Sequence, residues 1–265
     1  MKREAMPPPA VVVEVRQGAQ WIRLNRPEAM NALTPELLGG IDHALHEAEK
    51  NPEVRAVVLT GTGRAFCAGA DLKFVQAQSD ADGPRRFLDL VLATMNRLDS
   101  FPKPVIAALN GLALAGGLEL VLCCDLVLAA RGVKIGDAHA NYGLLPGGGS
   151  SVRLPRAIGP ARAKYLLFTG DFFTAEELVA AGLVNQVVDA AELEAATQAL
   201  VDKIAIKSPL GLRRMKTLVD DGLQQPIETA LRLELLASEV HSHSADQREG
   251  LLAFQEKRSP RFTGQ

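Results

Sequence analysis

Short apolar runs alternate with amphipathic, helix-length segments in the first part of the chain, and this alternation constrains the fold more than any other feature. The runs expected to form strands are residues 11–15, 21–24, 55–60, 104–109 and 126–130. Strands separated by segments of helical pattern are typical of sheets built with helical crossovers. The sequence therefore predicts an α/β fold.

The pattern changes near residue 190, after which strand signals stop and helical patterns follow one another. The expected helices are residues 192–206, 209–220, 226–240 and 245–257. Three helix starts carry capping signals, namely Thr34 before Pro35, Ser208 before Pro209, and Thr174 with Glu177. Because no long linker or repeat intervenes, we expect a core of residues 1–195 and a helical subdomain of residues 196–265.

Composition excludes several functional classes. The net charge is −2 and no long basic run occurs, so nothing indicates nucleic-acid binding. The N-terminal apolar run is too short for a signal sequence or a membrane span, and we expect a cytoplasmic protein that binds no membrane. Three cysteines, of which Cys123 and Cys124 are adjacent, match neither a disulfide framework nor a metal site, and we expect them to be reduced and buried.

Two stretches rich in small residues are the main candidates for a functional site. Residues 61–71 and 110–117 each follow a predicted strand, and the second ends at Gly116 and Gly117, where a helix is expected to begin. Free backbone N–H groups and the positive end of the helix dipole stabilise an oxygen that becomes negative during a reaction. Either stretch alone reads equally as a tight turn, but together they indicate an oxyanion hole. Neither they nor residues 147–150 complete a dinucleotide or phosphate-loop motif.

The order and spacing of several motifs identify a family. They are residues 24–33 (LNRPEAMNAL), 66–72 (FCAGADL), 103–111 (KPVIAALNG), 145–149 (LPGGG), 153–156, 169–171, 181–184 and 249–258. Over essentially its whole length the chain resembles the crotonase (enoyl-CoA hydratase/isomerase) superfamily. The resemblance implies a spiral of repeated strand–strand–helix (ββα) units with a C-terminal helical subdomain, assembled as a homotrimer or homohexamer.

By this resemblance, the backbone N–H groups of Ala70 and Gly116 bind the carbonyl oxygen of an acyl-CoA thioester. That oxygen gains negative charge as the thioester becomes an enolate, and fixed N–H donors stabilise it. Coenzyme A is part of the substrate, so no separate cofactor or metal is expected. The residues expected to border the substrate and its coenzyme A moiety are Ala68, Ala70, Asp71, Leu72, Lys73, Gly116 and Gly117.

Candidate partners for the coenzyme A phosphates are Arg26, Arg64 and Lys73, although loop cations are often only solvated. Many relatives carry lysine where this chain has Glu28, so we expect the phosphate contacts to be rearranged.

Two residues of the C-terminal tail also have counterparts in the family. Phe254 and Lys257 match residues that help to cover the coenzyme A site, sometimes that of a neighbouring subunit. Helix packing and solvent exposure are the alternative explanations for them.

Glu119 matches one of the two catalytic glutamates of enoyl-CoA hydratases, while His139 stands where the second is expected. A carboxylate within the apolar run of residues 118–122 is costly to bury without a role, although a helix N-terminus also stabilises one. An imidazole accepts or donates a proton near neutral pH, but His139 is equally readable as a loop histidine satisfied by its neighbours. Asp137 and Tyr142 are weaker candidates.

Three functional hypotheses follow. The leading one is an enoyl-CoA hydratase-like lyase of fatty-acid or related metabolism, such as β-oxidation, which adds water reversibly to a trans-2-enoyl-CoA with Glu119 and His139 in catalytic roles. The second is another reaction of the superfamily, enoyl-CoA isomerisation or thioester hydrolysis; the missing carboxylate at residue 139 counts against an ordinary isomerase. The third is a non-catalytic acyl-CoA-binding protein.

Overall fold

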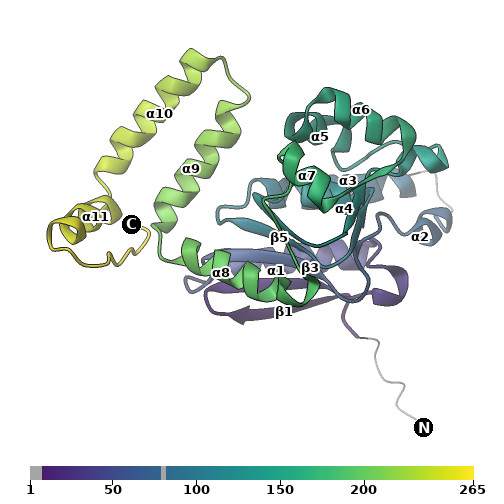
Figure 1. Cartoon of the computed structure of the whole chain (residues 1–265), viewed down its shortest axis with the longest axis horizontal. Coiled ribbons are helices and arrows are strands. Elements are labelled where there is room, and N and C mark those ends of the chain that lie inside the picture. Colours follow the sequence, from purple (N-terminus) through teal and green to yellow (C-terminus); the bar gives the residue numbers. More distant parts are fainter. Residues whose placement is uncertain (1–7, 79–81) are drawn as a thin grey trace, which may run out of the picture.

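A computed structural model of the chain describes residues 8–78 and 82–265 (Figure 1). The strands are β1 Val11–Arg16, β2 Ala19–Leu24, β3 Ala56–Gly61, β4 Ala65–Cys67, β5 Val105–Leu109, β6 Leu112–Leu114, β7 Leu126–Ala130, β8 Lys134–Gly136, β9 Phe172–Thr174 and β10 Gln186–Val188. The helices are α1 Pro35–Lys50, α2 Leu72–Gln76, α3 Gly83–Asp99, α4 Gly116–Val121, α5 Ser150–Ile158, α6 Pro160–Thr169, α7 Ala175–Ala181, α8 Leu193–Ala205, α9 Pro209–Gly222, α10 Ile227–Ser242 and α11 Ala245–Gln255. Short 3-10 turns are η1 Pro27–Ala29, η2 His139–Tyr142 and η3 Ala190–Glu192.

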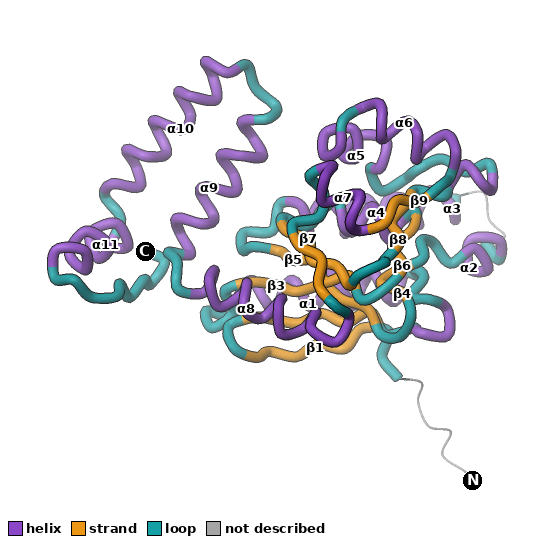
Figure 2. The backbone as a smooth tube through the Cα atoms, in the orientation of Figure 1, coloured by secondary structure: helices purple, strands orange, loops and turns teal. Residues whose placement is uncertain are grey.

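The strands form two sheets that share a repeating chain path. The larger sheet has the order β1-β2-β3-β5-β7-β10, and the smaller has the order β4-β6-β8-β9. In three successive passes, β3 with β4, β5 with β6, and β7 with β8, the first strand joins the large sheet and the second joins the small one. Helical segments follow each pair, as Figure 2 shows. The predicted α/β spiral of ββα units is therefore confirmed.

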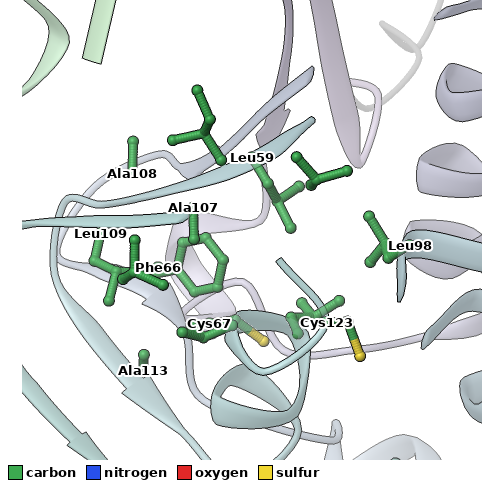
Figure 3. Close-up of a cluster of buried hydrophobic side chains, with 14 of the residues drawn as sticks. Leu59, Phe66, Cys67, Leu98, Ala107, Ala108, Leu109, Ala113 and Cys123 are labelled. Carbon is green, nitrogen blue, oxygen red and sulfur yellow. The ribbon is translucent and has the colours of Figure 1, made fainter. Parts of the chain in front are cut away.

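The hydrophobic core lies between the two sheets and the helices that cover them. Phe66 and Cys67 of β4 are fully buried in the same cluster as Leu59, Ala107 and Leu98, all of which are labelled in Figure 3. Continuous apolar runs suit strands covered on both faces, and every residue of β3 and β5 is buried. The small sheet, which includes parts of the two small-residue stretches, therefore packs against this buried core.

The cysteines are all free, as expected. Cys67 and Cys123 are buried, while Cys124 is half-buried. Burial raises the pKa of the Cys67 and Cys123 thiols to about 12. Because the thiolate is the reactive form, these thiols behave as small apolar core residues.

The C-terminal helices extend away from the sheets (Figure 1). All four predicted helices are present as α8 to α11, and the capping side chains of Thr34, Thr174 and Ser208 accept the expected backbone hydrogen bonds. The predicted boundary after residue 195 falls inside α8, which packs against β3, β5 and β7. The part that stands apart from the core begins with α9. The division into two domains stays a prediction.

Two further sequence expectations concern membrane-spanning helices and the N-terminal segment. No helix among residues 8–78 and 82–265 is long and apolar enough to cross a bilayer. The N-terminal segment considered for a leader lies, up to residue 7, outside the described residues.

Candidate active site

The two small-residue stretches lie side by side because each contains a short strand. β4 and β6 pair in parallel, with Ala65 opposite Leu112 and Cys67 opposite Ala113. Each stretch therefore contains a three-residue strand, β4 or β6. Three-residue strands of small side chains carry too little periodicity to be recognised in a sequence.

Ala70 and Gly116, the two residues expected to supply oxyanion donors, both line the same cavity. A parallel bridge between Leu33 and Ala70 uses the carbonyl of Gly69 and the N–H of Asp71, at 2.8 and 3.0 Å. Because backbone groups alternate along an extended segment, the N–H of Ala70 points away from Leu33. Gly116 is the first residue of α4, and its N–H is one of those that a helix leaves unpaired.

The backbone before Gly116 is held in an unusual conformation. Ala115, the N-cap of α4, has φ 49° and ψ −118°, a region that side-chain-bearing residues rarely occupy. Its N–H donates to the carbonyl of Gly136 (3.0 Å), at the end of β8. The turn into α4 is therefore anchored to the small sheet, which fixes the direction of the Gly116 N–H.

Glu119 lies one turn into α4, with its side chain directed to the loop that precedes α5. The residue is 2 % exposed, and its Oε1 accepts hydrogen bonds from the N–H of Gly148 (2.8 Å) and of Ser150 (3.1 Å). Burial raises the pKa of this carboxyl, while the Ser150 N–H, the charge of His139 and the Gly148 N–H oppose that rise. A buried carboxyl with a raised pKa is suited to accept and return a proton.

His139 opens the 3-10 turn η2 after β8 and lines the same cavity as Glu119. Its Nδ1 lies 2.8 Å from Oδ1 of Asp137, and its N–H donates to the same oxygen at 3.3 Å. Burial alone lowers the pKa of an imidazole, but the hydrogen bond and charge of Asp137, with the charge of Glu119, raise the pKa of His139 above its ordinary value. Tyr142, at the other end of η2, is 71 % exposed.

Away from Glu119, His139 and Gln78 the cavity lining is mostly apolar. Its volume is about 200 Å³, and its lining residues are Leu33, Ala70, Leu72, Val75, Gln78, Pro84, Phe87, Leu88, Val91, Gly116, Glu119, His139, Leu144, Leu145, Gly147 and Gly148. A mostly apolar pocket with a few convergent polar groups is the usual form of a small-molecule site.

Several residues expected to contact coenzyme A lie outside this cavity. Arg26 donates to Oδ2 of Asp71 (3.0 Å) and to the carbonyl of Ala32 (2.7 Å), so its guanidinium is occupied within the protein. Arg64 and Lys73 are exposed.

The other expected substrate-binding residues have varied positions. Gly117 is buried behind the cavity, where a Cβ would lie 2.0 Å from the carbonyl of Cys67. Ala68 is half-buried, and its N–H donates to the carbonyl of Met30 (3.1 Å). In the tail, Phe254 is 84 % exposed on α11, and Lys257, also exposed, follows that helix.

Sequence reasoning missed two parts of the site. The N–H groups of Gly148 and Ser150 donate hydrogen bonds to Glu119. In the sequence, residues 145–150 were considered only for the motifs they form. The apolar face of α3, including Phe87, Leu88 and Val91, forms one wall, and helical periodicity is the signal that predicts such a face. Within the described ranges, no three His, Cys, Asp or Glu side chains are grouped so as to hold a metal ion.

The spiral of ββα units and the cavity lined by Ala70, Gly116, Glu119 and His139 are what the resemblance to the crotonase superfamily implies. A sequence model for enoyl-CoA hydratase/isomerase matches residues 14–265. The chain belongs to this family and is an enoyl-CoA hydratase-like enzyme, a hydro-lyase.

Individual relatives agree over almost the full length. The chain is 38 % identical over 253 residues to crotonyl-CoA hydratase of Syntrophomonas wolfei, which covers 95 % of this chain and 97 % of the relative. It is 36 % identical over 249 residues to short-chain-enoyl-CoA hydratase of Clostridium acetobutylicum, with coverage of 94 % and 95 %. A crystal structure of enoyl-CoA hydratase from Bacillus anthracis superposes with a TM-score of 0.92 at 38 % identity, covering 97 % of this chain and 100 % of that one.

Proposed function

We propose that the enzyme adds water reversibly to C3 of a trans-2-enoyl-CoA, with the N–H groups of Ala70 and Gly116 as the oxyanion hole and Glu119 as the principal acid–base residue. The observation that carries this proposal is that Glu119, Ala70 and Gly116 all line one cavity. A hydro-lyase needs both a proton-transfer group near C2 and C3 and donors at the thioester oxygen. Each such donor contributes on the order of 3 kcal/mol to transition-state stabilisation.

The proton balance of the reaction assigns a task to each group. Ionised Glu119 takes a proton from water as the C3–O bond forms, and the electron pair of the double bond moves through C2 onto the thioester oxygen. The resulting enolate then takes a proton at C2, and protonated His139 donates that proton. Transfer of the proton from Glu119 back to His139 restores the starting state.

Two other superfamily reactions remain as outcomes of the test rather than as proposals. Double-bond isomerisation needs only proton transfer between carbons, and thioester hydrolysis needs water to attack the carbonyl carbon. The held carboxylate of Glu119, together with the named hydratase relatives, favours addition of water at C3.

The substrate is expected to lie with its acyl chain against the apolar wall from α3. Leu72, at the cavity edge, and the neighbouring residues Ala68 and Asp71 border the coenzyme A moiety in this proposal. Exposed Arg64 and Lys73 are its phosphate partners. Arg26, which is paired with Asp71, contributes by holding the loop.

We also propose a homotrimer, or a hexamer of two trimers. Support comes from apolar side chains exposed on α9 to α11, namely Met215, Val219, Leu223, Ile227, Leu231, Leu235, Leu236, Val240, Leu251, Leu252 and Phe254. A helical subdomain that exposes this many large apolar side chains is typical of one that packs against another subunit. In such an assembly Phe254 and Lys257 would cover the coenzyme A site of a neighbouring subunit. Light scattering of the wild type and of Leu235→Glu tests this.

The proposal includes a cytoplasmic location, a role in fatty-acid or related acyl-CoA metabolism, and a reaction that needs no separate cofactor. Free Cys67, Cys123 and Cys124 suit a reducing compartment. Cell fractionation tests the location, and activity after exhaustive dialysis against a chelator tests the cofactor requirement.

The central experiment follows loss of the conjugated enoyl absorbance over a series of trans-2-enoyl-CoAs. Glu119→Gln keeps an oxygen for the Gly148 and Ser150 N–H groups but cannot take a proton, so kcat is expected to fall about 10²- to 10⁴-fold. Glu36→Gln, an exposed change in the first turn of α1, serves as the matched control. Release of free thiol, or shift of a double bond without hydration, would replace the hydratase proposal with hydrolysis or isomerisation.

A further inference from the structure

The carboxylate of Asp137 is buried beside the active site, and its hydrogen-bond partners are both atoms of His139. Asp137 follows β8 and is 1 % exposed, and its Oδ1 meets the ring Nδ1 at 2.8 Å and the backbone N–H at 3.3 Å. Ala138, between them, has φ 59° and ψ −6°, and this left-handed turn lets residues 137 and 139 face each other. The pair is therefore built into the backbone path.

The second oxygen of this carboxylate argues against a purely structural role. Oδ2 of Asp137 is buried and has no hydrogen-bond partner in the described part of the chain. By contrast, the buried carboxylate of Asp246 accepts from the Ser208 hydroxyl and from the N–H groups of Thr263 and Gly264. A buried carboxylate kept for structure is normally satisfied in the manner of Asp246. Among the described residues, Asp137 instead has only the ring Nδ1 and the backbone N–H of His139 as partners, both at Oδ1.

We propose that Asp137 is a positioning residue that fixes the ring orientation and tautomer of His139, so that Nε2 exchanges protons in the cavity opposite Glu119. With Nδ1 held by the carboxylate, neutral His139 keeps its hydrogen on Nδ1 and offers a lone pair at Nε2. Protonated His139 offers an N–H there instead. This inference rests on the proposed hydration, because it gives His139 the proton delivered to C2.

Charge supports the same assignment. The charged groups that act on the pKa of His139 within the described residues are Asp137 after β8 and Glu119 on α4, and both favour the protonated ring against the opposing effect of burial. The helix α6, which packs against η2, carries Arg162, Lys164 and Tyr165, all exposed. Two carboxylates around one imidazole keep a proton available at Nε2 near neutral pH.

Asp137→Asn tests this by removing the charge while preserving the shape. An amide either accepts from Nδ1–H weakly or donates to Nδ1 and forces the hydrogen onto Nε2. Outer residues that orient an imidazole typically change activity by about 10- to 100-fold when replaced, so we expect kcat to fall by that factor with KM nearly unchanged. The alkaline limb of the pH–rate profile should move to lower pH.

A double-mutant cycle separates positioning from general stability. If Asp137 acts through His139, Asp137→Asn has no further effect on kcat in a His139→Gln background, whereas a structural role lowers kcat equally in both. Asp125→Asn is the matched control, since Asp125 is also a carboxylate paired with a cation, Lys216, but does not line the cavity. It should leave the pH profile unchanged. Equal losses in both backgrounds, or an unchanged profile in Asp137→Asn, would overturn the proposal.

A readout independent of turnover distinguishes this inference from the proposed function. In ¹⁵N-histidine-labelled protein, the signal of His139 among five histidines is assigned from its loss in His139→Gln. We expect the neutral ring to carry its hydrogen on Nδ1 and its pKa to fall in Asp137→Asn. An Nε2–H tautomer in the wild type would overturn the role of Asp137, whether or not the enzyme hydrates enoyl-CoAs. Failure of hydration with the Nδ1–H tautomer present would instead overturn the reaction and leave the pairing in place.

Discussion

Gly69 lies close to Ala115 where the segments that follow β4 and β6 meet: a Cβ on Gly69 would lie 2.8 Å from the Cβ of Ala115 and 3.3 Å from the Gly116 nitrogen. Gly69 also has φ +99°. Both observations exclude a side chain, since no real Cβ sits so close and left-handed backbone strains other residues. The spacing between the Ala70 and Gly116 N–H groups thus depends on a missing methyl group.

Gly69→Ala is therefore expected to push the two segments apart and misalign the donors. Loss of one oxyanion donor lowers kcat by about 10²- to 10³-fold, and the left-handed residue costs about 1–3 kcal/mol of stability. Steady-state kinetics and thermal melting measure the two effects. Gly132→Ala is the control, because Gly132 has φ +75° but nothing within 4 Å of its Cβ position. Similar losses of kcat in both variants would refute the geometric explanation.

The two titrating groups predict a bell-shaped dependence of kcat/KM on pH. The proposed mechanism needs Glu119 ionised and His139 protonated. The pKa of Glu119 is raised from 4.5 and that of His139 from 6.5, so the acid limb should lie above 4.5 and the alkaline limb above 6.5. The assignment of each limb is checked with two variants. Glu119→Gln should abolish the acid limb, and His139→Gln should abolish the alkaline limb.

The raised pKa of His139 also makes the stability of the fold depend on pH. A folded-state pKa above the unfolded value contributes stability that is fully present below about pH 6.5 and is lost as pH rises through the folded value. Urea denaturation of the wild type and His139→Gln across this range should converge at alkaline pH. Constant separation of the two curves would contradict a raised pKa.

The elements that sequence reasoning recovered are those whose signals are local. Thr174 with Glu177 forms the predicted capping box, and the apolar runs form strands within two residues of the expected ends, because caps and periodicity act over a few neighbouring residues. The C-terminal helices were predicted correctly for the same reason.

The remaining details depend on contacts or conformations that leave no local signal. Glu119 meets Gly148 and Ser150 across 29 and 31 residues of chain. The pairing of His139 with Asp137 depends on left-handed backbone at Ala138, and alanine is not a residue that indicates such a conformation. Tertiary structure imposes both, so the resemblance placed Glu119 and His139 in the site without explaining what orients them.

Asn31 is predicted to be essential for holding the segments that precede the site. It is fully buried with φ 56°, its Nδ2 donates to the carbonyls of Thr62 (3.0 Å) and Ala65 (2.8 Å), and its Oδ1 accepts from the Arg26 N–H (2.8 Å). Asn31→Ala should lower the free energy of unfolding by about 2–4 kcal/mol, since it leaves buried backbone groups unpaired. Urea denaturation measures this, and Asn51→Ala, which removes one exposed hydrogen bond, should cost far less.

Arg26 and Arg64 should have opposite phenotypes, although both were candidates for binding phosphate. Arg26 is bonded to Asp71, whose Oδ1 caps α2 by accepting from the Phe74 N–H (3.2 Å). Burial raises the pKa of Asp71, but the Arg26 hydrogen bond, the Phe74 N–H, the Arg26 charge and the Lys73 N–H together more than offset it and lower the pKa overall. Stability from this pair is present above the ordinary carboxyl pKa and is lost as pH falls through the lowered one.

Arg26→Gln is therefore expected to cost about 1–3 kcal/mol of unfolding free energy near neutral pH, and less at acid pH, because protonation of Asp71 removes the same stabilisation from the wild type. Arg64→Gln should change stability by less than about 0.5 kcal/mol, since the side chain is exposed, but should raise KM for enoyl-CoA and weaken its salt dependence. Urea denaturation at two pH values measures the stability of each variant. The KM for enoyl-CoA at two ionic strengths measures substrate binding and its salt dependence. An Arg26→Gln enzyme with normal stability and a raised, less salt-dependent KM would instead make Arg26 the phosphate partner, because only a cation free to leave Asp71 can produce that result.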